Sequence, residues 1–147
     1  MSRVFQIFTV FFLAELLTNC TGRTEQPRTL TATDSLWLNF ATAMERNDLE
    51  YLLANSLDSI RCVDCNPTTP NWEDEIYEAE YLFKNHLTDL MHLDNLSSGF
   101  STYQDSTLIR VGYTIEAPQA EEGAYNLVFT LEQKNGKYLL ADRFFVP

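Results

Sequence analysis

The stretch that decides the fold is Tyr125–Val146, which reads YNLVFTLEQKNGKYLLADRFFV. It contains two apolar runs on either side of Asn135 and Gly136. An Asn-Gly pair in this setting favours a β-hairpin, because both central residues of a type I′ turn need positive φ. We therefore expect two antiparallel strands, Tyr125–Leu131 and Tyr138–Val146, joined by a tight turn.

A third strand is predicted just before this hairpin. From Ser106 onward, apolar and polar residues alternate with a period of two, which is typical of a strand with one buried face. The segment Ala117–Gly123, which contains Pro118, is expected to be the loop that leads into the hairpin. The inward side chains of the predicted strand are Ile109, Val111, Tyr113 and Ile115.

Helical periodicity precedes the strands. Thr33 or Asp34 can cap a first helix that ends near Arg46. Asn47 and Asp48 interrupt it, because their side chains compete for nearby backbone groups. The apolar face of this helix contains Leu36, Trp37, Phe40, Ala41 and Met44, and a second short helix carries Leu49, Leu52 and Leu53.

The middle of the chain gives a weaker signal. Asp58–Val63 is expected to be a short strand, and the prolines in residues 66–70 predict a loop. Asn71 can cap a long helix that ends before Ser97. The residues on one face of this predicted helix are Ile76, Ala79, Phe83, Leu87, Leu90 and Met91.

Helices first and strands last predict an α+β domain, in which N-terminal helices pack on a curved, cone-like antiparallel sheet of three to four strands. In this order of elements and in its last hairpin, the chain resembles the nuclear-transport-factor-two-like family, a cystatin-like α+β fold. The resemblance covers Asp34–Val146 and extends to poorly characterised small bacterial lipoproteins. It implies a shape more than a chemistry, because one fold carries many functions.

Length and charge limit the classes of function. A chain of 147 residues has room for one domain around one core. Its net charge of -11 disfavours nucleic acid, since affinity for phosphates needs clustered Lys and Arg.

The N-terminus looks like a lipoprotein signal peptide. Arg3 precedes the apolar run Val4–Ala14, which is too short to span a bilayer. Leu17 and Thr18 then match the pattern that precedes a lipidated cysteine, here Cys20. We expect a signal peptide over residues 1–19, a flexible tether over 20–33 and a single domain over 34–147. The protein would then be exported and anchored in a bacterial membrane, facing the periplasm or the surface. An ordinary cleaved signal or a buried N-terminal helix is the alternative.

Cys62 and Cys65 form the sharpest local motif. Export favours a disulfide between them, because exported proteins meet oxidising conditions. A redox pair would need a helix directly after the first cysteine, and the Pro-rich segment that follows disfavours one. A zinc site with His86 and His92 is a third interpretation, in a looser spacing than that of a zinc finger.

Two other features could carry chemistry. Acidic residues from Glu73 to Glu80 lack the spacing of a calcium loop and favour a solvated helix start. Asp142 alternates with Tyr138, Leu140 and Phe144, so the period of two places one carboxylate on an apolar face, where it could act as a base. The alternative for Asp142 is a surface ion pair with an arginine.

The function that we expect is non-catalytic binding of a small ligand or of another envelope protein. The alternative is an isomerase- or hydrolase-like enzyme that uses the pocket of the cone. No cofactor and no metal are expected, Asp142 is the one weak catalytic candidate, and the sheet could pair two copies into a homodimer.

Overall fold

The computed structural model describes residues 29–65, 75–116 and 124–146. The predicted signal peptide, the predicted lipidation site Cys20, most of the predicted tether, the predicted cap at Asn71 and the predicted loop at 117–123 lie outside these residues. No helix in the described ranges is long and apolar enough to cross a membrane. The elements are α2 (Ala32–Glu45), α3 (Leu49–Ala54), β1 (Ser56–Cys62), β2 (Ile76–Glu78), α4 (Ala79–Asn85), α5 (Leu87–Met91), β3 (Phe100–Asp105), β4 (Leu108–Ile115), β5 (Tyr125–Lys134) and β6 (Lys137–Val146).

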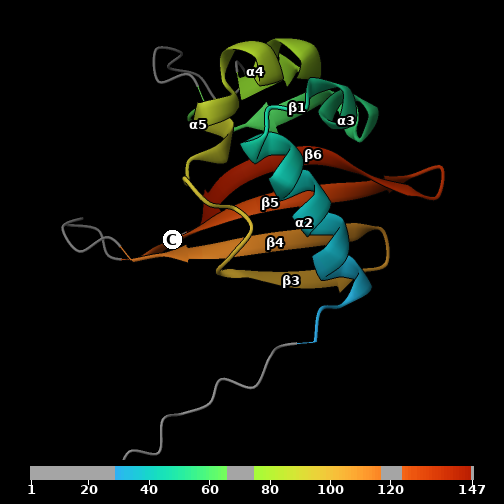
Figure 1. Ribbon diagram of the computed structural model, residues 1–147, viewed down its shortest axis with the longest axis vertical. Coiled ribbons are helices and arrows are strands. Elements are labelled where there is room, and N and C mark those ends of the chain that lie inside the picture. Colours follow the sequence, from blue (N-terminus) through green and yellow to red (C-terminus); the bar gives the residue numbers. More distant parts are fainter. Residues whose placement is uncertain (1–28, 66–74, 117–123, 147) are drawn as a thin grey trace, which may run out of the picture.

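The strands form one six-stranded sheet in the order β2-β1-β6-β5-β4-β3, and α2 lies diagonally across its face (Figure 1). Neighbouring strands are antiparallel except β1 and β6, which run parallel. The predicted α+β class is confirmed. The predicted strand count of three to four is too low, and the sheet is mixed rather than antiparallel. The two missed strands are β2, which has three residues, and β3, which is mostly polar.

Helix α2 begins earlier than the sequence predicts. Thr31 is the N-cap: its hydroxyl accepts the Asp34 N–H at 3.0 Å, while the Asp34 carboxylate accepts the Thr31 N–H at 2.9 Å. This reciprocal pair is a capping box, so the expected cap at Thr33 or Asp34 is wrong. The corner after the helix is confirmed, with Asn47 at φ 54° and Asp48 capping α3.

The long helix predicted up to Ser97 is wrong in the part that the structure describes. Its residues from Ile76 onward form the strand β2 and two short helices, α4 and α5. In β2, Tyr77 is buried and Ile76 is 61% exposed, which is the alternation of a strand. Between the helices, the Asn85 side chain donates to the Tyr81 carbonyl, and His86 leaves helical geometry at φ −131°. A side chain that competes for a backbone carbonyl in this way weakens a helix.

The hairpin predicted around Asn135 and Gly136 is confirmed. Asn135 has φ 54° and Gly136 has φ 78°, and the flanking Lys134 and Lys137 are paired across the turn. The pairing continues to Asn126 and Val146, with one irregularity between Thr130 and Leu131. At this point β6 carries one extra residue, Ala141, because Leu131 pairs with Leu140 and Thr130 pairs with Asp142. An extra residue of this kind is a β-bulge.

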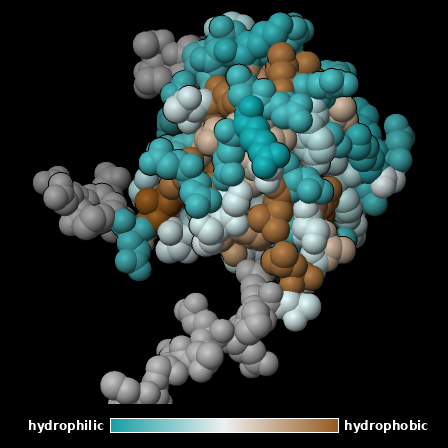
Figure 2. Space-filling model, viewed as in Figure 1, coloured by the Kyte–Doolittle hydropathy of each residue, from teal (hydrophilic) through white to brown (hydrophobic). Residues whose placement is uncertain are grey.

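Aromatic side chains fill the space between α2 and the sheet. Trp37 is fully buried, and its ring lies 4.8 Å from that of Phe129 and 6.3 Å from that of Tyr113. The Trp37 Nε1–H donates to the Tyr113 hydroxyl at 2.6 Å, and that hydroxyl donates to the Leu96 carbonyl at 2.5 Å. Burial raises the pKa of Tyr113, so the hydroxyl stays protonated as a donor. On the helix-covered side, Figure 2 shows a largely hydrophilic surface with separate apolar spots.

Candidate functional site

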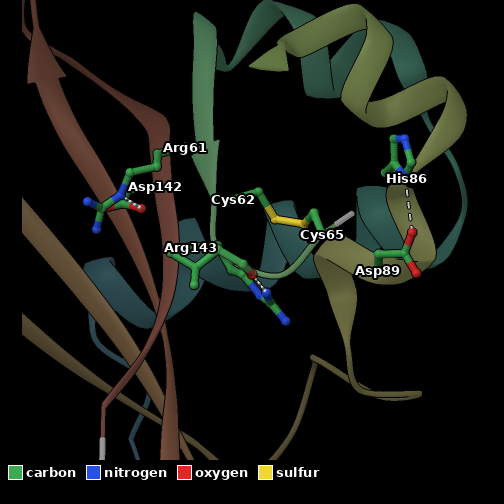
Figure 3. Close-up of a disulfide and its surroundings, with 8 residues drawn as sticks. Arg61, Cys62, Cys65, His86, Asp89, Asp142 and Arg143 are labelled. Atoms are coloured by element: carbon green, nitrogen blue, oxygen red, sulfur yellow. Dashed lines mark hydrogen bonds and ion pairs between the residues drawn. A yellow bond between two sulfur atoms is a disulfide. The ribbon is translucent and has the colours of Figure 1, made fainter. Parts of the chain in front are cut away.

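The bulge at Ala141 decides which way the side chains of β6 point. Asp142 pairs with Thr130 on the outer face of the sheet, while Arg143 pairs with Phe129 on the helix-covered face. Figure 3 shows Asp142 and Arg143 on opposite sides of the strand. The period of two expected from Leu140 to Asp142 is therefore broken, and Asp142 does not share a face with Leu140. Its carboxylate instead accepts from Arg61 Nε at 3.1 Å on β1.

We predict that Asp142→Asn changes stability little. The Arg61 and Asp142 side chains are 44% and 23% exposed, and ion pairs at such exposure contribute about 0.2–1 kcal/mol. The free energy of unfolding from urea titration should fall by no more than about 1 kcal/mol. A much larger loss would show that Asp142 has a role inside the domain.

Arg143 is the unusual polar group of the sheet. Its side chain comes from the centre of a strand and is only 1% exposed. Its Nη1 donates to the Val63 carbonyl, and the guanidinium carbon lies 4.2 Å from the centre of the Phe145 ring. Its Nε is buried and has no hydrogen-bond partner among the described residues. Leaving such a donor unpaired in a dry site costs about 1–3 kcal/mol, and more for a charged group.

The loop after β1 forms hydrogen bonds with both the backbone and the side chain of Arg143. The Val63 N–H donates to the Arg143 carbonyl at 3.0 Å, so backbone and side chain of Arg143 both bond to Val63. Cys62 and Cys65 flank Val63 at disulfide distance, with their Cα atoms 5.5 Å apart, and Figure 3 shows their sulfur atoms joined. Both cysteines are fully buried. The pair thus closes the turn that presents the Val63 carbonyl to the guanidinium.

Three acidic side chains act on Arg143 electrostatically. Burial lowers the pKa of Arg143 to about 10, while the negative charges of Asp64, Asp89 and Glu75 oppose this change. Over the described ranges, none of these carboxylates forms an ion pair with the guanidinium. The positive charge of Arg143 is therefore stabilised by carboxylates that are not hydrogen-bonded to it. Some of its N–H donors have no acceptor among the described residues.

An aromatic wall stands beside the guanidinium. It consists of His92, Tyr125 and Phe145, which come from the end of α5, the start of β5 and the end of β6. The His92 ring lies 5.1 Å from that of Phe145, and its Nε2 lies 3.2 Å from the Tyr125 hydroxyl. His92 has a left-handed backbone, with φ 59°, a conformation that non-glycine residues adopt only when their surroundings impose it.

We predict that His92 makes stability depend on pH. Burial and the positive charge of Arg143 lower the pKa of His92 below its ordinary value of 6.5, and Asp64 partly opposes this. Between that lower pKa and 6.5, only the unfolded chain binds the proton on His92. The free energy of unfolding is therefore highest above pH 6.5 and decreases as the pH falls through this range. The melting temperature should fall more for the native protein than for His92→Gln between about pH 7.5 and about pH 5.5. Equal losses would contradict the effect.

The two histidines of the zinc interpretation have other partners. His86 lies 3.1 Å from the Asp89 carboxylate and His92 lies next to Tyr125. Within the residues that the structure describes, no group of three or more His, Cys, Asp or Glu side chains could hold a metal ion. Of the acidic run, Glu73 and Asp74 lie outside the described ranges, and Glu80 pairs with Lys84 one helical turn later.

The outer face of the sheet has a shallow hollow of about 310 Å³. Its floor includes Gly112, which has no side chain, and its edges include Arg110, Tyr103 and Val146. Tyr103 is 63% exposed and Val146 is 38% exposed. This face is therefore open and partly apolar.

Sequence reasoning named Asp142 and missed Arg143 as a site residue. One signal was present: Arg143 stands inside the apolar run Leu139–Val146, where a cation is unusual. That signal did not predict on which face of the sheet the Arg143 side chain lies, because the bulge at Ala141 determines the face.

No protein-family model matches this chain, and no curated protein matches it. Solved structures do match. A variant of a protein named Rd1NTF2_05 superposes with a TM-score of 0.51 at 13% identity, over 76% of this chain and 94% of that one. A DUF4783 family protein from Bacteroides ovatus has a TM-score of 0.43 at 13% identity, over 71% and 88% of the two chains. A putative dehydratase of the NTF2-like family from Streptomyces avermitilis has a TM-score of 0.44 at 14% identity, over 78% and 96%.

At these identities the likeness shows the fold alone. The chain has an NTF2-like fold, NTF2 being nuclear transport factor two, and the predicted resemblance is confirmed at that level. This fold hosts ligand-binding domains and some enzymes, so the fold does not choose between them.

Proposed function

We propose that this chain is a non-catalytic domain that binds a small ligand at Arg143, and that a lipid on Cys20 holds it at a bacterial cell envelope. The domain would face the periplasm or the cell surface. One observation carries the binding role: a guanidinium that is 1% exposed and has a single protein acceptor in the described part of the chain. Burying a charge costs free energy unless it is paired, so such a group favours a ligand that completes its hydrogen bonds.

The same geometry gives less support to the isomerase or hydrolase alternative. Such an enzyme needs an acid or base inside the cone. The carboxylate expected there, Asp142, lies on the outer face with Arg61. Trp37, Tyr113 and Phe129 occupy the centre of the helix-covered face. These facts support binding over catalysis.

A thermal-shift screen of small ligands tests the binding role. The full chain, purified in detergent, and its Arg143→Gln variant would be screened against the same ligands. A ligand that occupies the native site at a hundred times its dissociation constant should stabilise the fold by about 2.7 kcal/mol. We expect ligands that raise the melting temperature of the native chain and leave the variant unchanged. Ligands that stabilise both equally would place binding elsewhere.

Membrane anchoring has its own test. The proposed anchor rests on the sequence around Cys20, whose acyl chains would hold the protein at a bilayer. In a bacterial host, Cys20→Ser should move the protein from the membrane fraction to the soluble fraction, and mass spectrometry of the native N-terminal peptide should show a lipid. An unmodified Cys20 in the membrane fraction would contradict the anchor.

Self-association through the outer sheet face is a further part of the proposal. Its support is the exposure of Tyr103 and Val146 beside the shallow hollow. Light scattering should give the mass of two copies, and Tyr103→Glu should restore one copy by placing charges at the contact. The mass of one copy for the native chain would contradict it.

A further inference from the structure

The surroundings of Arg143 restrict what could bind there. The guanidinium has donors in a planar fork, one of which bonds to Val63, and it stacks on Phe145. The buried Nε has no acceptor in the part of the chain that the structure describes. A carboxylate suits such a fork because two parallel N–H···O bonds can form at once.

A simple anion would meet repulsion at the same place. Asp64, Asp89 and Glu75 are close enough to act on Arg143 electrostatically. Asp64 is exposed and projects from the turn next to Val63, at φ 59°. A ligand with a positive group beside its carboxylate would turn this repulsion into attraction.

The aromatic wall suits an apolar body. Phe145 and Tyr125 are half-buried and pack edge to face at 5.4 Å, while His92 is the exposed member. Turning the His92 side chain away is a rotamer change, of a kind common when ligands bind. It would uncover the Phe145 ring, on which the Arg143 guanidinium stacks.

We propose that the ligand is a zwitterion of the amino-acid class: its carboxylate pairs with Arg143, its ammonium faces Asp64 and Asp89, and its apolar body lies on Phe145 and Tyr125. This inference rests on the proposed binding function and adds the chemistry of the ligand to it.

Four probes that share one aromatic body test the charges separately. They are phenylalanine, phenylpropanoate, phenethylamine and phenylpropanamide, which carry both charges, the negative one, the positive one and neither. Calorimetric titration of the full chain should show phenylalanine binding at least about tenfold more tightly than any of the others. If phenylpropanoate or the amide binds as tightly, the zwitterion is wrong and the binding function stands. If none of the four binds at millimolar concentration, the zwitterion is wrong, and the thermal-shift screen with Arg143→Gln decides the binding function separately.

Variants assign the two charges to residues. Arg143→Lys keeps the positive charge but lacks the fork, so it should weaken phenylalanine at least about tenfold while the chain still folds. Asp64→Asn should weaken phenylalanine and leave phenylpropanoate unchanged or tighter. Glu80→Gln, on the exposed face of α4, is the matched control and should change neither. Unchanged phenylalanine affinity in both Arg143→Lys and Asp64→Asn would overturn the inference.

Discussion

Replacing Trp37 with alanine should destabilise the protein by about 3–5 kcal/mol, the range for removing a large aromatic side chain from a core. Trp37 is fully buried, contacts the rings of Phe40, Tyr113 and Phe129, and donates to the Tyr113 hydroxyl. The truncation removes this packing and leaves a cavity between α2 and the sheet. It also takes a donor from a buried hydroxyl. Urea denaturation followed by circular dichroism measures the loss.

Trp37→Phe separates packing from hydrogen bonding. It keeps a ring in the core and loses only part of the volume and the indole N–H, so its cost should be clearly smaller than that of alanine. Leu30→Ala, at a position that is 54% exposed, is the surface control and should stay within about 0.5 kcal/mol. A loss below about 1 kcal/mol for Trp37→Ala would show that the core does not depend on this side chain.

Leu140→Asp should have the second large effect, on the order of 4 kcal/mol or more. Leu140 is fully buried opposite Leu131 on the helix-covered face. Aspartate there removes apolar packing and places a carboxylate among buried apolar side chains. The melting temperature and the urea midpoint should both fall, or the chain should fail to fold.

Asp142→Leu is the matched control, because the two changes exchange the same residue types two positions apart. Asp142 lies across the bulge on the outer face, so leucine there loses only the pair with Arg61, worth about 1 kcal/mol at most. A regular strand without the bulge would place both positions on one face and give the reverse result for Asp142→Leu. A clear gain in stability from Asp142→Leu would therefore contradict the bulge at Ala141.

Local signals predicted the elements that local physics controls. The hairpin turn follows from Asn135 and Gly136, since these residues tolerate positive φ. The corner at Asn47 follows from side-chain competition for the backbone. In both places the structure adopts the expected geometry without help from distant residues.

Strands β2 and β3 depend on distant partners instead. The polar β3 is held by pairing with β4 over six residues, and its Thr102 hydroxyl donates to the Asp34 carboxylate on α2. Its sequence gives little period-two signal because no residue of this edge strand is fully buried, and only Phe100 and Thr102 are partly covered. The three residues of β2 pair with β1 in the same way. The periodicity of a short segment does not reveal a pairing strand from another part of the chain.

Only some residues of the candidate site could be predicted from the sequence. Cys62 and Cys65 stand out by spacing, and the structure places them around Val63, which accepts from Arg143. His92 was considered only as a metal ligand, and the structure places it in the aromatic wall with Tyr125 and Phe145. These residues lie close together only because β1 pairs with β6 in parallel, which places Cys62 beside Arg143.

The sequence by itself determined the α+β class, the hairpin and the first helix, because apolar periodicity and turn residues act over short distances. The proposed lipidation at Cys20 also rests on the sequence alone. Only the tertiary structure decided that Arg143, not Asp142, faces the helices. The physical reason is one extra residue, Ala141: a bulge reverses the facing of every later side chain in a strand, and whether a bulge forms depends on the pairing of β6 with its neighbours.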